Sequence, residues 1–308
     1  MKHLLGLSDK SAAEILKILD KSAEMKSLLK SGNKKDSRLK GKSVINLFYE
    51  SSTRTRLSFE LAGKYLSADV ASIAAKGSSV SKGESLIDTA RTIDSMAADV
   101  IILRHQNSGA AKLVSENVKA SVINAGDGMN EHPTQALLDM FTMLEAKGRI
   151  EGLKVAIVGD IAHSRVARSN IYALTKMGAN VSIAAPRTLI PPGVETLAQP
   201  PGSCNVCANV EEAISGVDVV MALRIQQERM KSALLPSLRE YAAYFGINEK
   251  RLSLAKPDAI LMHPGPVNRG VELTSLVADG AQSLIDEQVT NGVAVRMAVL
   301  ELLIGGVA

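Results

Sequence analysis

The stretch that decides the fold is VINLFYESSTRTRLSFELAGKYL, residues Val44 to Leu66. Its first part, Val44–Tyr49, is rich in the β-branched and aromatic side chains that favour a short strand. Thr53–Leu66 then has apolar residues at helical spacing, and Ser52 directly before it is a favourable helix cap. A strand followed at once by a helix is the repeating unit of parallel α/β folds.

The same alternation continues along the whole sequence. A first helix is predicted from Ser11, which forms a capping-box pattern with Glu14. Further strands are predicted at 70–74, 100–103, 122–124, 155–158, 181–184, 217–223 and 260–262, with a short one in CNVC before Asn209. Further helices are predicted at 84–97, 110–117, 132–147, 165–177, 210–215, within 230–245 and at 286–304. Short apolar strands between helices indicate parallel sheets with crossover connections.

The chain has 308 residues, which is too long for one ordinary core. We therefore predict an α/β fold with two doubly wound domains, each a mainly parallel sheet of four to five strands flanked by helices. The domains are expected at residues 1–131 and 132–285, with a C-terminal helix at 286–308 packing back on the first domain. Two interdomain helices would bridge them.

Composition narrows the class of function. The chain is 46% hydrophobic and 22% charged, with a net charge of +4 that is spread along the sequence. Aromatic residues are only 3% and Trp is absent, which disfavours the stacking surfaces of single-strand nucleic-acid binders. No segment approaches the ~18 uncharged apolar residues of a membrane span, and the N-terminus does not resemble a signal peptide. We expect a cytoplasmic protein that binds neither nucleic acid nor membrane.

The two cysteines, Cys204 and Cys207, form a CxxC pattern. A structural zinc site needs four ligands, and neither a second CxxC nor a nearby His supplies them. We interpret both residues as ordinary thiols.

Polar and cationic residues follow the predicted strands. In open parallel sheets, ligands bind beyond the carboxyl ends of the strands. After the first strand, the free backbone N–H groups of a helix start, several hydroxyls and Arg54 predict a site for a phosphate, with Arg104 after a neighbouring strand. His132 and Gln135 follow another strand at a helix start, where an imidazole can donate to a carbonyl oxygen.

The second half has its own cationic strand ends. Arg165 follows VAIVG, and Arg224 and Arg229 lie in RIQQER, which suggests a carboxylate-bearing substrate. The sequence lacks GxGxxG, GxxxxGK[ST], HExxH and GxSxG, which disfavours a dinucleotide, a nucleotide triphosphate, a zinc protease and a serine hydrolase. We expect chemistry by positioning and hydrogen bonds, with no metal and no cofactor.

Together, SSTRTRLSFE, LRH, HPTQALLD and HPGP occur in the order and spacing of the aspartate/ornithine carbamoyltransferase family, which the chain resembles over essentially its whole length. RIQQER resembles the aspartate-binding loop, whereas ornithine-type members usually show HPCQ and a Cys-Leu-Pro. The resemblance implies transfer of a carbamoyl group from carbamoyl phosphate to L-aspartate, giving N-carbamoyl-L-aspartate and phosphate in de novo pyrimidine biosynthesis.

The resemblance also implies residue roles. Carbamoyl phosphate would be bound by Ser52, Thr53, Arg54, Thr55, Arg104, His132, Gln135 and the backbone carbonyls of Pro264 and Gly265. Of these, Arg54, Thr55, Arg104 and His132 would act catalytically. Aspartate would be bound by Arg165, Arg224 and Gln226, and Glu50 would bridge to Arg165 and Arg229 in domain closure.

A neighbouring chain of a homotrimer would contribute Ser78 and Lys82 to a shared active site. The trimer would stand alone or join regulatory or dihydroorotase chains. Three alternatives remain at this stage. They are a carbamoyltransferase acting on ornithine or a related amine, a catalytically silent family member, and a nicotinamide-dependent oxidoreductase, the last disfavoured by the missing glycines.

Overall fold

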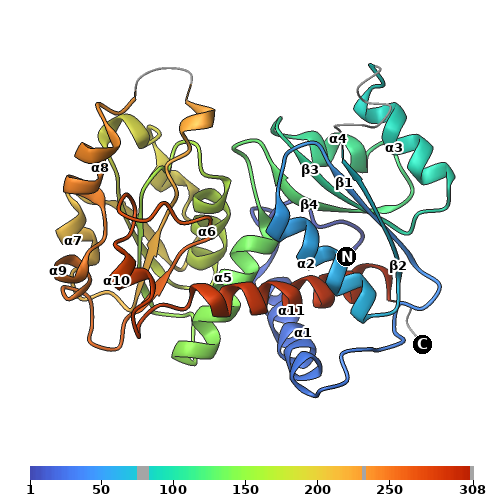
Figure 1. The fold of residues 1–308 in the computed structure, drawn as a ribbon, viewed down its shortest axis with the longest axis horizontal. Coiled ribbons are helices and arrows are strands. Elements are labelled where there is room, and N and C mark those ends of the chain that lie inside the picture. Colours follow the sequence, from blue (N-terminus) through green and yellow to red (C-terminus); the bar gives the residue numbers. More distant parts are fainter. Residues whose placement is uncertain (75–82, 231–233, 306–308) are drawn as a thin grey trace. The chain divides into compact units, whose positions relative to one another are not determined.

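The computed structural model describes residues 1–74, 83–230 and 234–305. The chain divides into two compact units, Met1–Leu138 with the segment from Val289 onward, and Asp139–Gln288. Both divisions fall inside helices, α5 (Pro133–Lys147) and α11 (Ile285–Ile304), so each of these helices belongs to both units (Figure 1). The two predicted bridging helices are thus confirmed. The predicted limits after residues 131 and 285 stay a prediction.

The first unit is built on a parallel sheet with the strand order β2-β1-β3-β4. Its strands are β1 (Ser43–Phe48), β2 (Asp69–Ala74), β3 (Val100–His105) and β4 (Ser121–Asp127). Its helices are α1 (Ala12–Lys30), α2 (Thr53–Tyr65), α3 (Leu86–Ser95) and α4 (Ala110–Ser115), with the ends of α5 and α11 given above. From β1 the chain adds β2 on one side and β3 and β4 on the other, so the winding direction switches between β1 and β3.

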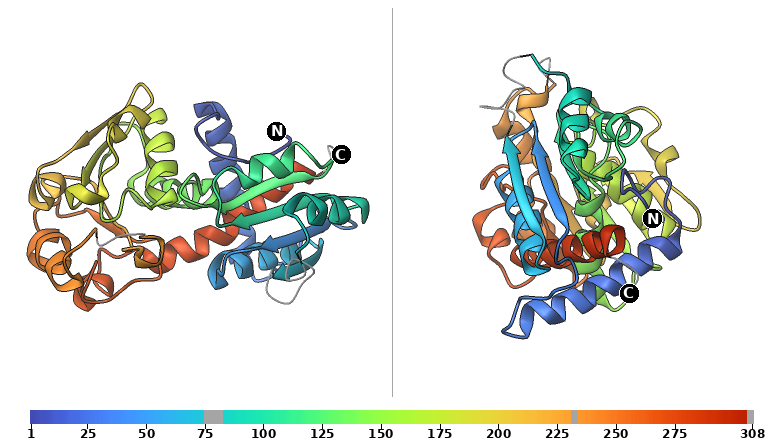
Figure 2. Two further views of the ribbon diagram at one scale, coloured as in Figure 1. Left: turned by 90° about the horizontal axis from the view of Figure 1, so that it is seen from above. Right: turned by 90° about the vertical axis from the view of Figure 1, so that its right-hand side faces the viewer.

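Helices cover both faces of this sheet. On one face, α3 and α4 pack on a core that includes Leu47, Ile101 and Val122. On the other, α2 approaches so closely that a Cβ added to Gly63 would come within 2.6 Å of a Val70 methyl group. Two views in Figure 2 show α1 and α11 side by side, and an ion pair of 3.3 Å joins Lys21 to Glu301 between them. Because helices cover both faces of the sheet, side chains on both sides of each strand are buried, which explains the near-continuous apolar runs of these strands.

The second unit is built on a parallel sheet with the order β7-β6-β5-β8-β9. Its strands are β5 (Lys154–Val158), β6 (Asn180–Ala184), β7 (Ser203–Val206), β8 (Val219–Ala222) and β9 (Ile260–Met262). Its helices are α6 (Arg165–Lys176), α7 (Val210–Ile214), α8 (Leu238–Phe245), α9 (Glu249–Leu252) and α10 (Ser275–Ala278), with the 3-10 turns η2 (Arg187–Leu189), η3 (Val194–Leu197) and η4 (Gln227–Arg229). Here the winding direction switches between β5 and β8.

The predicted α/β fold with two doubly wound domains is confirmed, and the sheets have four and five strands. The capping box of Ser11 and Glu14 forms in both directions at the start of α1. The first three residues of CNVC lie in edge strand β7, and Asn209 caps α7 as predicted. The ends of elements differ from the predictions by one to a few residues, as is usual where helices fray. Within the described part of the chain, no helix has the length and apolarity to cross a membrane.

The two cysteines are free thiols of the edge strand and the loop after it. Cys204 is buried, and burial raises the pKa of its thiol to about 12. Cys207 is partly buried, which also raises the pKa of its thiol. Thiols with raised pKa values are poor nucleophiles and poor metal ligands at neutral pH, in accord with the interpretation as ordinary thiols.

Candidate active site

The predicted site residues of the first unit lie at its topological switch point. Strands β1 and β3 are adjacent and parallel, and their carboxyl ends carry Glu50–Thr55 and Arg104. A backbone bond of 2.8 Å from Tyr49 N to Arg104 O ties the two strand ends together. Ligands of doubly wound sheets bind at this position, because the chain leaves adjacent strands in opposite directions there and opens a crevice.

The start of α2 has the features of an anion site. Ser52 caps the helix, and its hydroxyl oxygen accepts from Thr55 N at 3.3 Å, which leaves the hydroxyl proton able to donate elsewhere. The first turn has no acidic residue to oppose an anion. Thr53 and Arg54 are exposed, whereas Thr55 is only 7% exposed. The backbone N–H groups of a helix start and the helix dipole favour negative charge at this end, which suits the binding of a phosphate.

Arg104 is held in place by two groups of its own unit. One terminal nitrogen forms a 2.6 Å ion pair with Glu50, and the other donates to the carbonyl oxygen of Ala125 at 3.1 Å. The register between β3 and β4 shifts at this point, since Leu103 pairs with Asn124 but His105 with Asp127. The extra residue in β4 lies next to or at Ala125, and a bulge of this kind re-aims the groups of its strand. A guanidinium fixed in this way presents its charge in a set direction.

His132 and Gln135 lie at the start of α5, at the end of the turn that follows β4. Both are buried, at 4% and 8% exposed. The His132 carbonyl accepts from Gln135 N at 3.0 Å, which begins the helix. The predicted pair is therefore fixed on one helical turn of the first unit.

At the switch point of the second unit, the loops that follow β5 and β8 lie next to each other. Gly159 has a φ of +138°, and a Cβ there would lie 2.6 Å from the Leu223 carbonyl oxygen, so only glycine allows this approach. Asp160 is fully buried and accepts from the backbone and ring nitrogens of His163, at 3.1 and 2.9 Å, and from Gln226 N at 3.3 Å. Asp160 thereby ties the two loops together.

These loops carry the cationic residues predicted for a carboxylate substrate. Arg165 is the first residue of α6, directly after the cap Ser164, and is 3% exposed. Arg224 and Gln226 are half-buried on the loop after β8. Arg229 lies on the same loop and donates to the His163 carbonyl oxygen at 2.9 Å. Within the second unit, the structure therefore brings Arg165 and the 224–229 loop to one sheet edge.

The loop that contains Pro264 and Gly265 follows β9 at the same edge. His263 N donates to the side-chain oxygen of Gln288 at 2.9 Å, and Gly265 N donates to His263 Nδ1 at 2.8 Å. The other end of the Gln288 amide donates to buried Asp139 at 2.8 Å. Pro264 and Gly265 are half-buried, so part of this loop is open to solvent.

Sequence reasoning missed the residues that hold these loops. Glu272 accepts from Ile225 N at 2.9 Å and from Asn268 N at 2.8 Å, and burial raises the pKa of its carboxyl. Asp160 was missed as well, although an acid three residues before His163 is a pattern for a side chain that binds nearby backbone. The contacts of Glu272 join distant segments and leave no such local signal.

Two predictions lie beyond what the structure describes. Ser78 and Lys82 fall outside the described residues. The expected bridge from Glu50 to Arg165 and Arg229 joins different units and stays a prediction, while Glu50 pairs with Arg104 inside its own unit.

Among residues 1–74, 83–230 and 234–305, no three His, Cys, Asp or Glu side chains gather as a metal site requires, and the expectation of metal-free chemistry stays a prediction.

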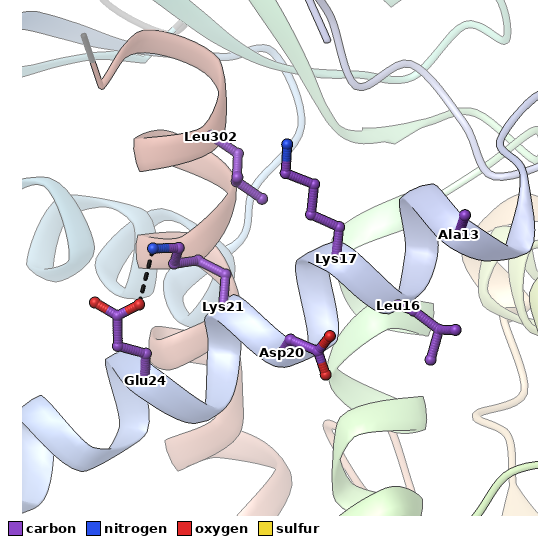
Figure 3. Close-up of a pocket in the computed structure, with 7 residues that line it drawn as sticks. All are labelled: Ala13, Leu16, Lys17, Asp20, Lys21, Glu24 and Leu302. Carbon is purple, nitrogen blue, oxygen red and sulfur yellow. Dashed lines mark hydrogen bonds and ion pairs between the residues drawn. The ribbon is translucent and has the colours of Figure 1, made fainter. Parts of the chain in front are cut away.

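A surface depression of about 490 Å³ lies elsewhere on the first unit (Figure 3). It is lined by residues of α1 and by Leu302 of α11, none of which was predicted as a site residue. Its 2.8 Å ion pair between Lys21 and Glu24 is partly exposed, and pairs of this kind contribute little to binding or stability. The switch points, rather than this depression, are the candidate site.

The fold and these groups define a class of protein. Each unit is a doubly wound parallel sheet with arginines at its switch point, and the first adds a helix start that suits a phosphate. Such a chain belongs with enzymes that bind two anionic substrates. A family model described as the carbamoyl-P binding domain of aspartate/ornithine carbamoyltransferase matches residues 2–145, and one described as the Asp/Orn binding domain matches 151–303. The chain belongs to the aspartate/ornithine carbamoyltransferase family.

Individual relatives agree. The chain is 65% identical over 302 residues to the aspartate carbamoyltransferase catalytic subunit of Ruminiclostridium cellulolyticum, which covers 98% of this chain and 95% of that protein. It superposes on the aspartate transcarbamoylase of Trypanosoma cruzi in complex with N-(phosphonacetyl)-L-aspartic acid with a TM-score of 0.89 and 32% identity, covering 97% and 94% of the two chains. The ornithine carbamoyltransferase of Pyrococcus furiosus gives a TM-score of 0.90 and 32% identity, covering 100% and 98%.

Proposed function

We propose that this protein transfers the carbamoyl group of carbamoyl phosphate to the amine of L-aspartate, giving N-carbamoyl-L-aspartate and phosphate. The observation that carries the proposal is the 65% identity to an aspartate carbamoyltransferase catalytic subunit over 98% of the chain. The anion site of the first unit and the arginines of the second support it. Overall structural similarity does not choose the acceptor, because a similar TM-score is found for an ornithine enzyme.

In the proposed reaction the first unit binds carbamoyl phosphate. Ser52, Thr53, Arg54 and Thr55 donate to the phosphate from the start of α2, and Arg104 adds its charge from β3. His132 donates to the carbamoyl carbonyl oxygen together with Thr55 and Arg104. Gln135 and the backbone carbonyls of Pro264 and Gly265 accept from the carbamoyl amide.

The second unit binds aspartate. Arg165, Arg224 and Gln226 hold its two carboxylates, which leaves the neutral amine to attack the carbamoyl carbon. The new C–N bond forms as the bond to the phosphate oxygen breaks, its electron pair leaves with phosphate, and the phosphate takes up the proton that the amine loses. Charge grows on the carbonyl oxygen and on the leaving group, and donors fixed at both places stabilise the transition state more than the ground state. Holding two anions together also supplies proximity.

We further propose that the protein works in the cytoplasm as a homotrimer, in which Ser78 and Lys82 of one chain complete the site of the next. Regulatory or dihydroorotase chains are candidate partners of such a trimer. Sedimentation equilibrium measures the oligomer directly. Mixing inactive Lys82→Ala chains with inactive Arg54→Ala chains tests sharing, because hybrids with one intact site regain activity only if the site is shared.

An acceptor assay tests the proposed reaction. The purified protein is given carbamoyl phosphate with aspartate or with ornithine, and the carbamoylated product is measured. Product with aspartate alone supports the proposal, and product with ornithine alone assigns the other branch of the family. No product with either indicates a silent family member. N-(phosphonacetyl)-L-aspartic acid, the compound in the Trypanosoma cruzi structure, should inhibit competitively against carbamoyl phosphate.

A further inference from the structure

The first residues of the chain form a short segment that runs beside β4, here called the N-terminal strap and defined as Leu4–Ser8. Leu4 N donates to Val122 O at 2.9 Å, and Asn124 N donates to Leu4 O at 2.9 Å. Leu4 pairs in parallel with Ile123 and is fully buried. The strap therefore extends the sheet by one bridge beyond its β4 edge, and it then continues toward the turn that precedes His132.

The strap ends against Glu131, the residue directly before His132. The Glu131 side chain is 3% exposed, and its two carboxylate oxygens accept from Leu7 N at 2.7 Å and Ser8 N at 3.3 Å. A Cβ added to Gly6 would lie 2.3 Å from one of these oxygens. The carboxylate thus sits directly on the strap backbone, and only glycine at position 6 leaves room for it.

The turn that carries Glu131 is itself held from two sides. Asp127 accepts from Glu131 N at 3.1 Å, and Asp127 N donates to the Glu131 carbonyl at 3.3 Å. Asn124 donates to the Asp127 carboxylate and to the Leu5 carbonyl oxygen, both at 2.8 Å. Because Asn124 contacts both segments, the strap and the turn are one hydrogen-bonded unit, and a shift of the strap moves Glu131.

We propose that the N-terminal strap, acting through Glu131, positions His132 for the carbamoyl-transfer step, with Glu131 as a positioning residue. His132 follows Glu131 by one peptide bond, and its carbonyl starts α5 by accepting from Gln135 N at 3.0 Å. The position of the His132 backbone, and with it the first turn of α5, then depends on where Glu131 is held. This inference rests on the proposed function, in which His132 and Gln135 contact the carbamoyl group.

Two variants disturb the contact in different ways, and a third serves as a matched control. Glu131→Gln keeps the size of the side chain but has one acceptor oxygen instead of two. Leu7 N and Ser8 N each need an acceptor, so one of them loses its partner oxygen. Gly6→Ala keeps the Glu131 carboxylate but adds a methyl group that displaces it. Asp94 also accepts from two backbone N–H groups, Lys119 N at 3.0 Å and Ala120 N at 2.8 Å, but just before the opposite end of β4. Both bonds go to Asp94 Oδ1, an oxygen that asparagine keeps, so Asp94→Asn is a control for removing the charge of a backbone-binding carboxylate away from His132.

The expected result is a fall in kcat of about 10- to 100-fold in Glu131→Gln and in Gly6→Ala, because small misplacements of a reacting group cost this much. The KM for aspartate should change little, and Asp94→Asn should keep its kcat. If Glu131→Gln does not fold, Gly6→Ala carries the test. Equal kcat values in all three variants and the wild type would overturn the proposal.

A spectroscopic readout separates this inference from the proposed reaction. The ring C2–H signal of His132, assigned by its loss in His132→Asn, should move in Glu131→Gln and Gly6→Ala but not in Asp94→Asn. An unmoved signal contradicts positioning by the strap. A moved signal in a protein that carbamoylates no acceptor leaves positioning intact and rejects the proposed function.

Discussion

Replacing Arg104 by alanine tests the anion site of the first unit. The side chain is 11% exposed, and its contacts include an ion pair with Glu50 at 2.6 Å and a hydrogen bond to the Ala125 carbonyl oxygen. Losing these contacts should cost about 1.5–3 kcal/mol of unfolding free energy, the range for hydrogen bonds to charged groups. In a domain of the size of the first unit, each kcal/mol lowers Tm by about 2–4 °C, so the variant should stay folded at room temperature.

The effect on turnover should be larger than the effect on stability. Arg104 is assigned to the charge that grows on the carbonyl oxygen and the phosphate, and losing one such donor costs about 10²–10³ in kcat. The assay is the initial rate of carbamoyl-aspartate formation at saturating substrates, with a thermal melt by circular dichroism on the same sample. A folded Arg104→Ala protein within about tenfold of the wild-type kcat would refute the assignment.

Glu50→Gln is the matched control for this experiment. It removes the ion pair but leaves the guanidinium and its bond to Ala125 in place. Its melt should fall by a similar amount because the same ion pair is lost. If its kcat falls as far as that of Arg104→Ala, the loss arises from the missing Glu50 carboxylate, through the position of the guanidinium or through the predicted bridge to Arg165 and Arg229, rather than from the charge of Arg104.

Three further predictions concern other parts of the chain. Arg165→Ala should raise the KM for aspartate by about 10- to 100-fold, the equivalent of one charge-assisted contact, while exposed Arg187→Ala in the same unit should not. Cys204 should resist alkylation in the native protein at pH 8 and react once the chain is unfolded in urea, because burial raises the pKa of its thiol to about 12; rapid native labelling would contradict this. Burial lowers the pKa of His105 below 6.5. The neutral imidazole therefore adds stability above that pH, and this stability is lost as the pH falls through the folded-state pKa. His105→Asn should accordingly show a smaller fall in Tm than the wild type between about pH 7.5 and 5.5.

Much of the fold could be predicted because its signals are local. The run Val44–Tyr49 followed by a Ser-capped helix specifies a strand and a helix without reference to the rest of the chain. The same is true of Asn209, whose side chain caps α7 by accepting from Glu212 N at 2.8 Å. Short elements such as α9 and α10 were not predicted, because four residues carry too little periodicity to stand out.

The candidate site divides in the same way. Motif residues such as Ser52, Arg104 and His132 could be found because each follows a predicted strand. The groups that hold these residues and their loops in place could not be found from the sequence. Glu131 contacts Leu7 across 124 positions, and Glu272 contacts Ile225 across 47. No sequence periodicity reports a contact between segments so far apart.

The sequence by itself determined the class of fold, the positions of the strand ends and the chemical groups placed there. It did so because strand and helix patterns repeat over a few residues and because parallel strands must present their carboxyl ends at one edge. Only the tertiary structure decided which strands are neighbours, that Glu50 pairs with Arg104, and that the first residues of the chain reach Glu131. Those contacts depend on strand order and on a register shift opposite Arg104, which arise from packing of the whole sheet rather than from any local run of residues.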